Sequence, residues 1–282
     1  MPVLPRPRKR LGQHFLIDLN IVRKILKIAA LNPEDVVFEI GPGRGALTHA
    51  LCERVARVIA VEFDRNLVEY LAHTCAPYDN LELHHGDALE FPCETLPAGT
   101  VVIANLPYYV STPLVFRLLE DRDRIDRMVL MLQREVAERM TASPGSRDYG
   151  LLSVVTQYLT KPRKAFVVPA SCFRPVPQVD SAVVCLTGRA VWNPADARFD
   201  DVFMKVVRGA FAHRRKTLIN SCREEGWEEP VLRRALEETN VDPRRRAETL
   251  TVKEFIALAQ SIRQASSKPS PREPSVLLSS PT

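Results

Sequence analysis

The 282-residue chain is long enough for one large domain and a small one, and its 45% hydrophobic and 26% charged residues are typical of a soluble globular protein. No apolar run approaches the roughly 18 to 20 residues that a membrane span needs, and the N-terminus has no apolar signal-peptide core, which predicts a cytoplasmic protein without membrane contact. The six cysteines are far apart and form no CxxC pair, so neither a zinc site nor a disulfide framework is expected.

The net charge of +5 is less informative than the way the charge is clustered. Basic residues gather in three runs, which are Arg6 to Arg10 (interrupted by Pro7), Arg214-Arg215-Lys216 and Arg244-Arg245-Arg246. Such clusters bind phosphate backbones through counterion release, although a single run is more often a solvated surface. Three separate runs leave nucleic-acid binding and a plain solvated surface as open alternatives at this point.

In chain order, residues 35–189 alternate short β-branched apolar runs with helical stretches, the pattern of a mostly parallel sheet covered by helices. The predicted strands span residues 36–40, 58–63, 81–85, 101–104 and 128–132. Helices are predicted at 45–54, 66–73 and 111–119, the last with Pro113 in its first turn. Two further strands within residues 164–187, around the proline-rich turn 173–177, are expected to add an antiparallel edge.

After Arg189 the strand signal stops, and Asn193-Pro194 is predicted to link the first domain, residues 1–192, to a helical domain, residues 193–265. One helix face is predicted from helical spacing of apolar residues, namely Phe199, Val202, Phe203, Val206, Val207, Ala210 and Phe211. Further helices are expected at 217–222, 230–239 and 251–264. Residues 1–10 are predicted to form a flexible basic arm, and residues 266–282, rich in serine and proline, a disordered tail.

The first candidate site is the glycine-rich stretch Gly41-Pro42-Gly43-Arg44-Gly45, which follows a predicted strand and leads into a predicted helix. Glycines there allow a tight turn and let a ligand approach backbone amides. Alone, the stretch fits nicotinamide, flavin or S-adenosylmethionine cofactors, or a purely structural turn. Glu62 lies 62 − 41 = 21 residues after the first glycine, near the roughly 20-residue spacing at which a carboxylate reaches ribose hydroxyls. Asp64 is interpreted as a helix cap instead.

A second carboxylate is expected at the same sheet edge, because the third strand ends in Gly86-Asp87-Ala88. Asp87 can accept a hydrogen bond from the adenine amine of a cofactor. An adenosyl group lying across three strand ends uses such a partner, whereas a nicotinamide cofactor does not require it. The alternative is that Asp87 only caps a Gly-Asp turn.

The most informative motif is Asn105-Leu106-Pro107-Tyr108, at the end of the fourth predicted strand. The lone pair of an adenine N6 is delocalised into the ring, so this nitrogen is a poor nucleophile. Acceptors on both N–H bonds, the Asn105 side-chain oxygen and the Leu106 carbonyl, can pull it towards tetrahedral geometry. Pro107 stiffens the turn, and Tyr108 can stack on the base. Catalysis of this kind consists mainly of orientation. An ordinary Asn-x-Pro turn is the structural alternative.

With these elements in this order, the sequence resembles the KsgA-type small-subunit (16S) ribosomal RNA adenine N6,N6-dimethyltransferases from about Arg10 to Ala265. The resemblance includes residues 11–16 (LGQHFL), 173–181 (FRPVPQVDS), 211–218 (FAHRRKTL) and 246–250 (RAETL). It implies a Class I, Rossmann-like methyltransferase domain with a small all-helical C-terminal domain. It further implies that the protein dimethylates two adjacent adenines near the 3′ end of 16S rRNA in a pre-30S or 30S particle. We expect a monomer, because no obvious interface stripe stands out in the sequence.

The resemblance also assigns residues. S-adenosylmethionine would contact His14, Leu16, Gly41, Gly43, Glu62, Asp87, Ala88 and Asn105. The catalytic set would be the Asn105–Tyr108 motif with Phe173, which would close the target pocket opposite Tyr108. Arg214, Arg215 and Lys216 would face the RNA backbone.

Three other functions share parts of this pattern. The related antibiotic-resistance enzymes that methylate an adenine of 23S rRNA share the cofactor and chemistry, but the motifs of the second domain resemble the small-subunit enzymes. DNA adenine methyltransferases have a similar tetrapeptide but differ in residues 11–16 and 173–181. A non-catalytic assembly or transcription factor with the same fold is disfavoured because Asn105, Pro107, Tyr108, Glu62 and Asp87 are intact.

Overall fold

The computed structural model describes residues 3–188, 197–213 and 215–267. The chain forms two compact units, Met1–Trp192 and Asn193–Thr282. The predicted Asn193-Pro194 linker lies outside the described residues, as do residues 268–282 of the predicted tail. Ser266 and Ser267, which were assigned to that tail, instead complete the last turn of a helix that began at Val252.

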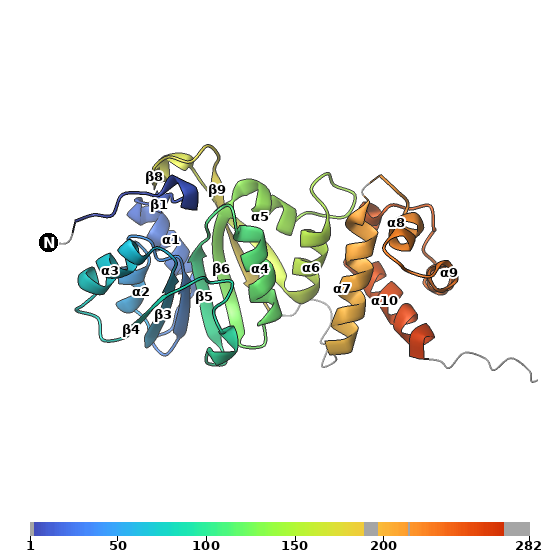
Figure 1. Ribbon diagram of the computed structural model, residues 1–282, viewed down its shortest axis with the longest axis horizontal. Coiled ribbons are helices and arrows are strands. Elements are labelled where there is room, and N and C mark those ends of the chain that lie inside the picture. The colour runs from blue at the N-terminus through green and yellow to red at the C-terminus, as the bar shows by residue number, and fades with distance from the viewer. Residues whose placement is uncertain (1–2, 189–196, 214, 268–282) are drawn as a thin grey trace, which may run out of the picture. The chain divides into compact units, whose positions relative to one another are not determined.

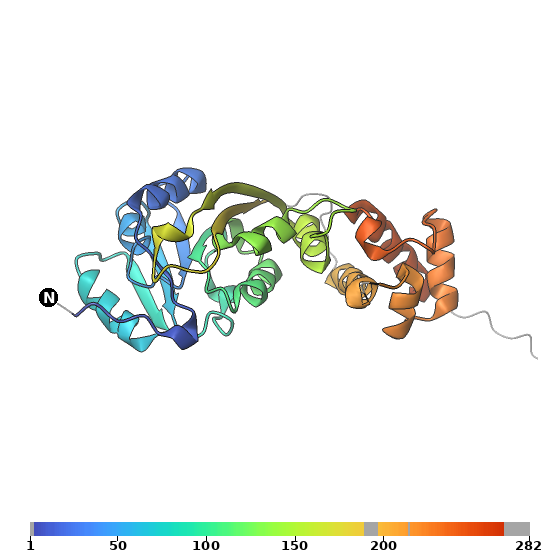
Figure 2. The same ribbon diagram turned by 90° about the horizontal axis from the view of Figure 1, so that it is seen from above.

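The larger unit is an α/β sandwich, with a seven-stranded sheet and helices on both of its sides (Figure 2). The strand order is β4-β3-β2-β5-β6-β9-β7, where the first five strands are parallel and β9 pairs antiparallel with both β6 and β7. The strands are β2 (Val36–Ile40), β3 (Arg57–Glu62), β4 (Leu81–His85), β5 (Thr100–Asn105), β6 (Ile125–Gln133), β7 (Lys161–Val168) and β9 (Ser181–Thr187). The predicted parallel sheet with an antiparallel edge is therefore confirmed.

The helices of this unit can be followed in Figure 1. They are α1 (Leu19–Ala29), α2 (Thr48–Cys52), α3 (Arg65–Thr74), α4 (Ser111–Glu120), α5 (Arg134–Met140) and α6 (Leu151–Leu159). Helix α2 begins at Thr48, three residues later than predicted. Gly43 and Gly45 have φ values of +61° and +84°, which lie outside the helical region, so the backbone turns through these residues before the helix can start.

Helix α1 was not among the predicted helices, although its sequence is amphipathic. The Asp18 side chain caps it by accepting a hydrogen bond from the Asn20 N–H at 2.8 Å. Its buried residues recur at helical spacing and are Ile21, Val22, Ile25, Leu26 and Ala29. They join a core with sheet residues such as Val37, Ile103 and Val183. Each fully buried aliphatic side chain there contributes about 1.5 to 3 kcal/mol, which fixes α1 against the sheet.

The smaller unit is helical and consists of α7 (Ala197–Ala212), α8 (Leu218–Glu224), α9 (Glu229–Glu238) and α10 (Val252–Ser267). Helix α7 packs against α8 and α10. Of its predicted apolar face, the buried residues are Phe199, Phe203, Val206, Val207 and Ala210.

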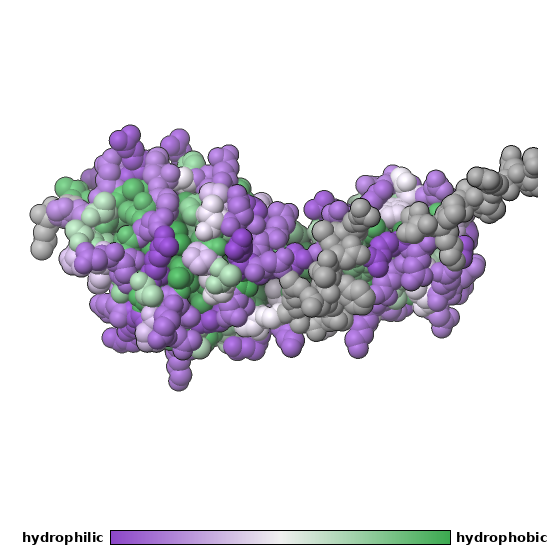
Figure 3. Space-filling view, turned by 90° about the horizontal axis from the view of Figure 1, so that it is seen from below, coloured by the Kyte–Doolittle hydropathy of each residue, from purple (hydrophilic) through white to green (hydrophobic). Residues whose placement is uncertain are grey.

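One face of the molecule, drawn in Figure 3, is mainly hydrophilic, and its apolar side chains gather on the larger unit. Among the described residues, no helix is both long enough and apolar enough to cross a membrane.

Candidate active site

The glycine-rich turn follows β2 and lies at the point where the strand order of the sheet reverses, with β3 on one side of β2 and β5 on the other. Open α/β sheets bind ligands at the carboxyl ends of the strands at such a point. Gly41 has a φ of +66°, and a Cβ on it would stand 3.8 Å from the Asn105 carbonyl oxygen. A Cβ on Gly43, with a φ of +61°, would stand only 3.1 Å from the Phe15 ring. Both positions therefore favour glycine, and the turn leaves its backbone open to a ligand.

Glu62 ends β3 and is 6% exposed. Its Oε2 accepts a hydrogen bond from the Gly43 N–H at 3.1 Å, and its Oε1 accepts one from the Asp64 N–H at 2.9 Å. Burial raises the pKa of this carboxyl above its ordinary value. The two backbone donors fix the carboxylate beside the glycine-rich turn, and each oxygen keeps a lone pair with which to bind a hydroxyl of a ligand.

Glu39, near the end of β2, was not assigned a role from the sequence. It is 1% exposed and lines the same cavity as Glu62. Burial is the main cause that raises the pKa of Glu39 to about 8, and the nearby Glu62 adds to it. Its Oε2 has no hydrogen-bond partner among the described residues. A buried carboxyl oxygen without a partner favours a ligand that brings a hydrogen-bond donor, which fits the ammonium group of S-adenosylmethionine.

The Asn105–Tyr108 motif begins at the last residue of β5. The Asn105 Nδ2 donates to the His14 carbonyl oxygen at 3.3 Å, so the side-chain amide is oriented and its Oδ1 is left to accept from a substrate. The Leu106 N–H donates to the Met131 carbonyl oxygen at 2.9 Å, which ties the motif to β6. Asn105 and Leu106, which both line the cavity, are therefore held in place at the end of β5.

Tyr108 is held by contacts on two sides. Its hydroxyl is 2.7 Å from the Ser181 Oγ, and its ring is stacked on the His14 ring with centroids 5.5 Å apart. Burial raises the pKa of the Tyr108 hydroxyl, so the phenol is neutral. The His14 Nδ1 is in turn 2.7 Å from the Pro175 carbonyl oxygen. The ring of Tyr108 is thus fixed by residues from two distant parts of the sequence, residues 11–16 and 173–181.

Residues 11–16 form one wall of the cavity. The short strand β1 (Phe15–Leu16) pairs antiparallel with β8 (Phe173–Arg174), which places Leu16 opposite Phe173. This pairing brings together the two motifs that the sequence analysis attributed to the same family.

Nine of the predicted site residues line one cavity: His14, Leu16, Gly41, Gly43, Glu62, Asn105, Leu106, Pro107 and Tyr108. Besides the buried Phe15, two exposed aromatic residues that were not predicted as site residues also line it. They are Phe63 and Tyr109, which are 54% and 58% exposed. Each directly follows a predicted site residue in sequence, and this adjacency was the only sequence signal for them.

Three predicted residues are not brought into this cavity. Asp87 lines a neighbouring pocket with His84 and Phe91, and its Oδ1 accepts from the Leu89 N–H at 2.9 Å, the capping contact considered as its alternative role. Ala88 follows Asp87 and lines neither pocket. Phe173 is fully buried and belongs to the core beneath α1. A stacking role for Phe173 therefore requires its side chain to leave that core.

The basic side chains of the smaller unit differ in whether they form ion pairs within the protein. Arg214 lies outside the described residues; Arg215 is exposed, and Lys216 is ion-paired with Glu224. The Leu218 N–H donates to the Arg245 carbonyl oxygen at 2.8 Å, so residues 215–218 and 244–246 lie side by side.

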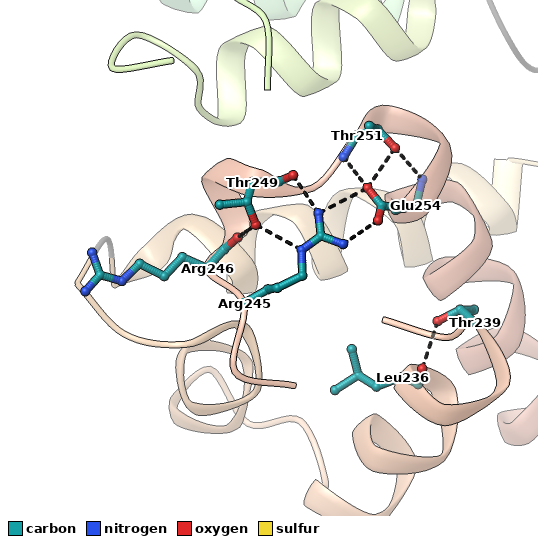
Figure 4. A network of polar contacts seen from close by, with 7 residues as sticks. All are labelled: Leu236, Thr239, Arg245, Arg246, Thr249, Thr251 and Glu254. Carbon is teal, nitrogen blue, oxygen red and sulfur yellow. Dashed lines mark hydrogen bonds and ion pairs between the residues drawn. The ribbon is translucent and has the colours of Figure 1, made fainter. Parts of the chain in front are cut away.

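Arg245 itself is a structural residue, as Figure 4 shows. Its guanidinium contacts the Glu254 carboxylate and donates to the Thr249 carbonyl oxygen at 2.6 Å and the Thr249 Oγ1 at 3.1 Å. The exposed Arg246 side chain points away from this network in the same view. The two neighbouring arginines therefore have different surroundings, and only Arg246 presents its charge to solvent.

Comparison with known proteins finds relatives along nearly the whole chain. The model of a family described as "Ribosomal RNA adenine dimethylase" matches residues 5–264. Two proteins named "Ribosomal RNA small subunit methyltransferase A" are similar to it. The one from Moorella thermoacetica is 46% identical over 268 residues, covering 91% of this chain and 92% of the relative. The one from Pelotomaculum thermopropionicum is 47% identical over 281 residues, covering 92% of each.

Solved structures give the same result. A dimethyladenosine transferase from Plasmodium falciparum superposes with a TM-score of 0.77 at 28% identity, covering 90% of this chain and 98% of that one. The 23S rRNA methyltransferase ErmE superposes with a TM-score of 0.69 at 25% identity, covering 89% of this chain and all of that one. The sheet and the helical unit are therefore both found in methyltransferases of known structure.

Proposed function

The chain belongs to the ribosomal RNA adenine dimethylase family, whose enzymes methylate adenine with S-adenosylmethionine, and we propose that its substrate is the 3′-terminal hairpin of 16S rRNA. It transfers methyl groups to N6 of two adjacent adenines there and yields N6,N6-dimethyladenosine. The substrate particle is a pre-30S or 30S ribosomal subunit in the cytoplasm, and the enzyme acts as a monomer. The names of the relatives with more than 40% identity, which specify the small subunit, support this choice.

The observation that carries the proposal is the pair of oxygens at the end of β5. Asn105 is oriented through its Nδ2, so its Oδ1 faces a substrate donor, and the Leu106 carbonyl is the second acceptor. When both N–H bonds of an adenine N6 donate to these oxygens, the nitrogen lone pair is directed out of the base plane. The cofactor supplies a methyl group activated by its sulfonium. The nitrogen would form a bond to that methyl carbon while the electrons of the broken C–S bond stay on sulfur, and the methylated nitrogen would lose one N–H proton to solvent.

The remaining site residues hold the two reactants in place. Glu62 and the turn at Gly41 and Gly43 are suited to bind the ribose and methionine parts of the cofactor, and Glu39 is suited to receive its positive charge. The neutral Tyr108 ring supplies a flat surface on which the target base stacks. His14 and Leu16 complete the cofactor side of the cavity. Asp87, one pocket away, is the proposed partner of the cofactor adenine.

The smaller unit is proposed to bind the RNA backbone. Arg215, Lys216 and Arg246 are exposed and lie on adjoining loops, which supports a surface that attracts phosphates without reading sequence. Arg214 belongs to the same proposal through its place in the sequence.

Asn105→Ala tests the catalytic assignment. Removing one acceptor of a positioned pair is expected to lower the rate of methyl transfer to unmethylated 30S particles by about 100-fold or more. The stabilisation of the protein by S-adenosylhomocysteine in a thermal melt should remain. Asn20→Ala, an exposed asparagine at the start of α1, is the matched control and should be as active as the wild type. Wild-type methyl incorporation by Asn105→Ala would refute the assignment.

A further inference from the structure

The Asp64 carboxylate is buried, with 2% of it exposed, and it makes more contacts than a helix cap needs. Its Oδ1 accepts from the Asn66 N–H at 3.1 Å, which is the expected cap of α3. Its Oδ2 accepts from the Gln13 Nε2 at 3.0 Å and lies 3.2 Å from the Arg8 Nε. Two of these three partners belong to the N-terminal segment, residues 5–16. A buried carboxylate needs such partners, so Asp64 is fully satisfied only when this segment is in place.

Gln13 is held at both ends of its amide. Its Nε2 donates to Asp64, and its Oε1 accepts from the Arg8 N–H at 2.8 Å. Rotation of the amide breaks both bonds at once, so the orientation of this side chain is well determined. Gln13 thereby joins the backbone of the N-terminal segment to Asp64, the residue that caps α3.

A second attachment of the N-terminal segment involves Arg44, which lines the cavity. The Arg44 guanidinium donates to the Pro5 carbonyl oxygen at 2.7 Å and stands 4.3 Å from the centroid of the Phe15 ring. Of the described N-terminal residues, only Phe15 and Leu16 pair with another strand. The stretch before them, of which residues 1–10 were predicted to be a flexible arm, is held mainly by polar side-chain contacts. Segments held in this way open locally at lower cost than segments anchored in the core.

The N-terminal segment is connected to the cofactor residues by a continuous chain of hydrogen bonds. Residues 11–16 line the cavity, and Gln13 bonds to Asp64. The Asp64 N–H donates to Glu62, whose second oxygen accepts from Gly43. Asp64 therefore holds the wall of the cavity through its side chain, which contacts Gln13. Through its backbone N–H it also holds Glu62, the residue proposed to bind the cofactor ribose.

We propose that Arg8, Gln13 and Asp64 form a latch that holds the N-terminal segment against the cofactor cavity and sets the rate at which the cofactor and its product leave. The inference rests on the proposed function only in taking this cavity as the S-adenosylmethionine site. The three are positioning residues: they act on the wall of the cavity and through Glu62. Exchange of product for a new cofactor opens the latch, and closure restores the two contacts to the buried carboxylate.

The test is the dissociation rate of S-adenosylhomocysteine from the full-length protein, measured by stopped-flow displacement together with the equilibrium Kd. Gln13→Ala is expected to raise both by about ten-fold, the scale of one hydrogen bond to a charged group. Arg8→Ala should act in the same direction, and Arg8→Lys, which keeps the charge, should restore part of the loss. The double variant should show less than the sum of the two single effects, because both remove the same closed state.

The matched control is Arg65→Ala, which removes an exposed ion pair with Glu69 on α3, the helix that Asp64 caps. S-adenosylhomocysteine should dissociate from this variant at the same rate as from the wild type. In steady state, the latch variants should raise KM for S-adenosylmethionine while kcat stays within about two-fold. If Gln13→Ala and Arg8→Ala both release S-adenosylhomocysteine at the wild-type rate, the latch is refuted. This holds even if the two variants have lower melting temperatures than the wild type. Failure of the wild type to bind S-adenosylhomocysteine would instead refute the assignment of the cavity, which separates the two claims.

Discussion

The buried Glu39 carboxyl gives the most specific prediction about stability. Its pKa in the folded protein is about 8, against an ordinary value of 4.5. Below pH 4.5 the carboxyl is protonated in both states, and its contribution to folding is fully present. Between pH 4.5 and 8 the unfolded chain loses the proton but the folded protein keeps it, so the free energy of unfolding falls as pH rises. At 1.36 kcal/mol per pH unit, the interval corresponds to a loss of roughly 5 kcal/mol at most.

Glu39→Gln removes this titration and keeps the shape of the side chain. The difference in unfolding free energy, variant minus wild type, should therefore rise from pH 4.5 to pH 8 by about 2 to 5 kcal/mol and then level off. Urea denaturation in a series of buffers measures it, without a ligand. Glu53→Gln, an exposed carboxyl on the neighbouring surface, is the control and should give a flat difference. A flat difference for Glu39→Gln would refute the account of a neutral, buried Glu39.

Two further predictions concern the target base and the RNA. Tyr108→Phe removes the contact with Ser181 and should cost about 1 kcal/mol of unfolding free energy while methyl transfer continues. Tyr108→Ala also removes the stacking surface and should slow transfer by about 10- to 100-fold, and equal losses in the two variants would contradict a stacking role. Arg245→Ala should lower the free energy of unfolding by about 1 to 3 kcal/mol, because the network in Figure 4 is lost. Arg246→Ala should leave stability unchanged but reduce the salt dependence of 16S rRNA binding by about one unit of slope, and a reversed pattern would contradict the distinction between them.

The sheet could be predicted from the sequence because each strand carries its own signal. The buried strand Val36–Ile40 is mostly apolar, the partly exposed edge strand Leu81–His85 alternates apolar and polar residues, and the positions of both were confirmed. The start of α2 was wrong because the positive φ values of Gly43 and Gly45 depend on packing around the turn. Helix α1 was missed although the sequence carries its signals, an Asp18 cap and apolar residues at helical spacing.

The candidate site could be predicted only where one motif supplies the chemistry. Glu62 and Asn105 end β3 and β5, the two parallel strands on either side of β2, so both lie at the same edge of the sheet. The contacts of Asp64 with Arg8 and Gln13 join residues about 50 positions apart in sequence and have no local signal. The burial of Phe173 likewise depends on the pairing of β1 with β8. Glu39 lies two residues before the glycine-rich stretch, but that its Oε2 lacks a hydrogen-bond partner can be read only from the folded chain.

The measurement that tests the central claim most directly is the incorporation of labelled methyl groups into purified ribosomal subunits that lack the modification. With S-adenosylmethionine in excess, 30S particles should accept up to four methyl groups each, two on each of two adjacent adenines of 16S rRNA, and 50S particles should accept none. Methyl groups recovered on 23S rRNA of the 50S particles, with none on the 30S particles, would contradict the account.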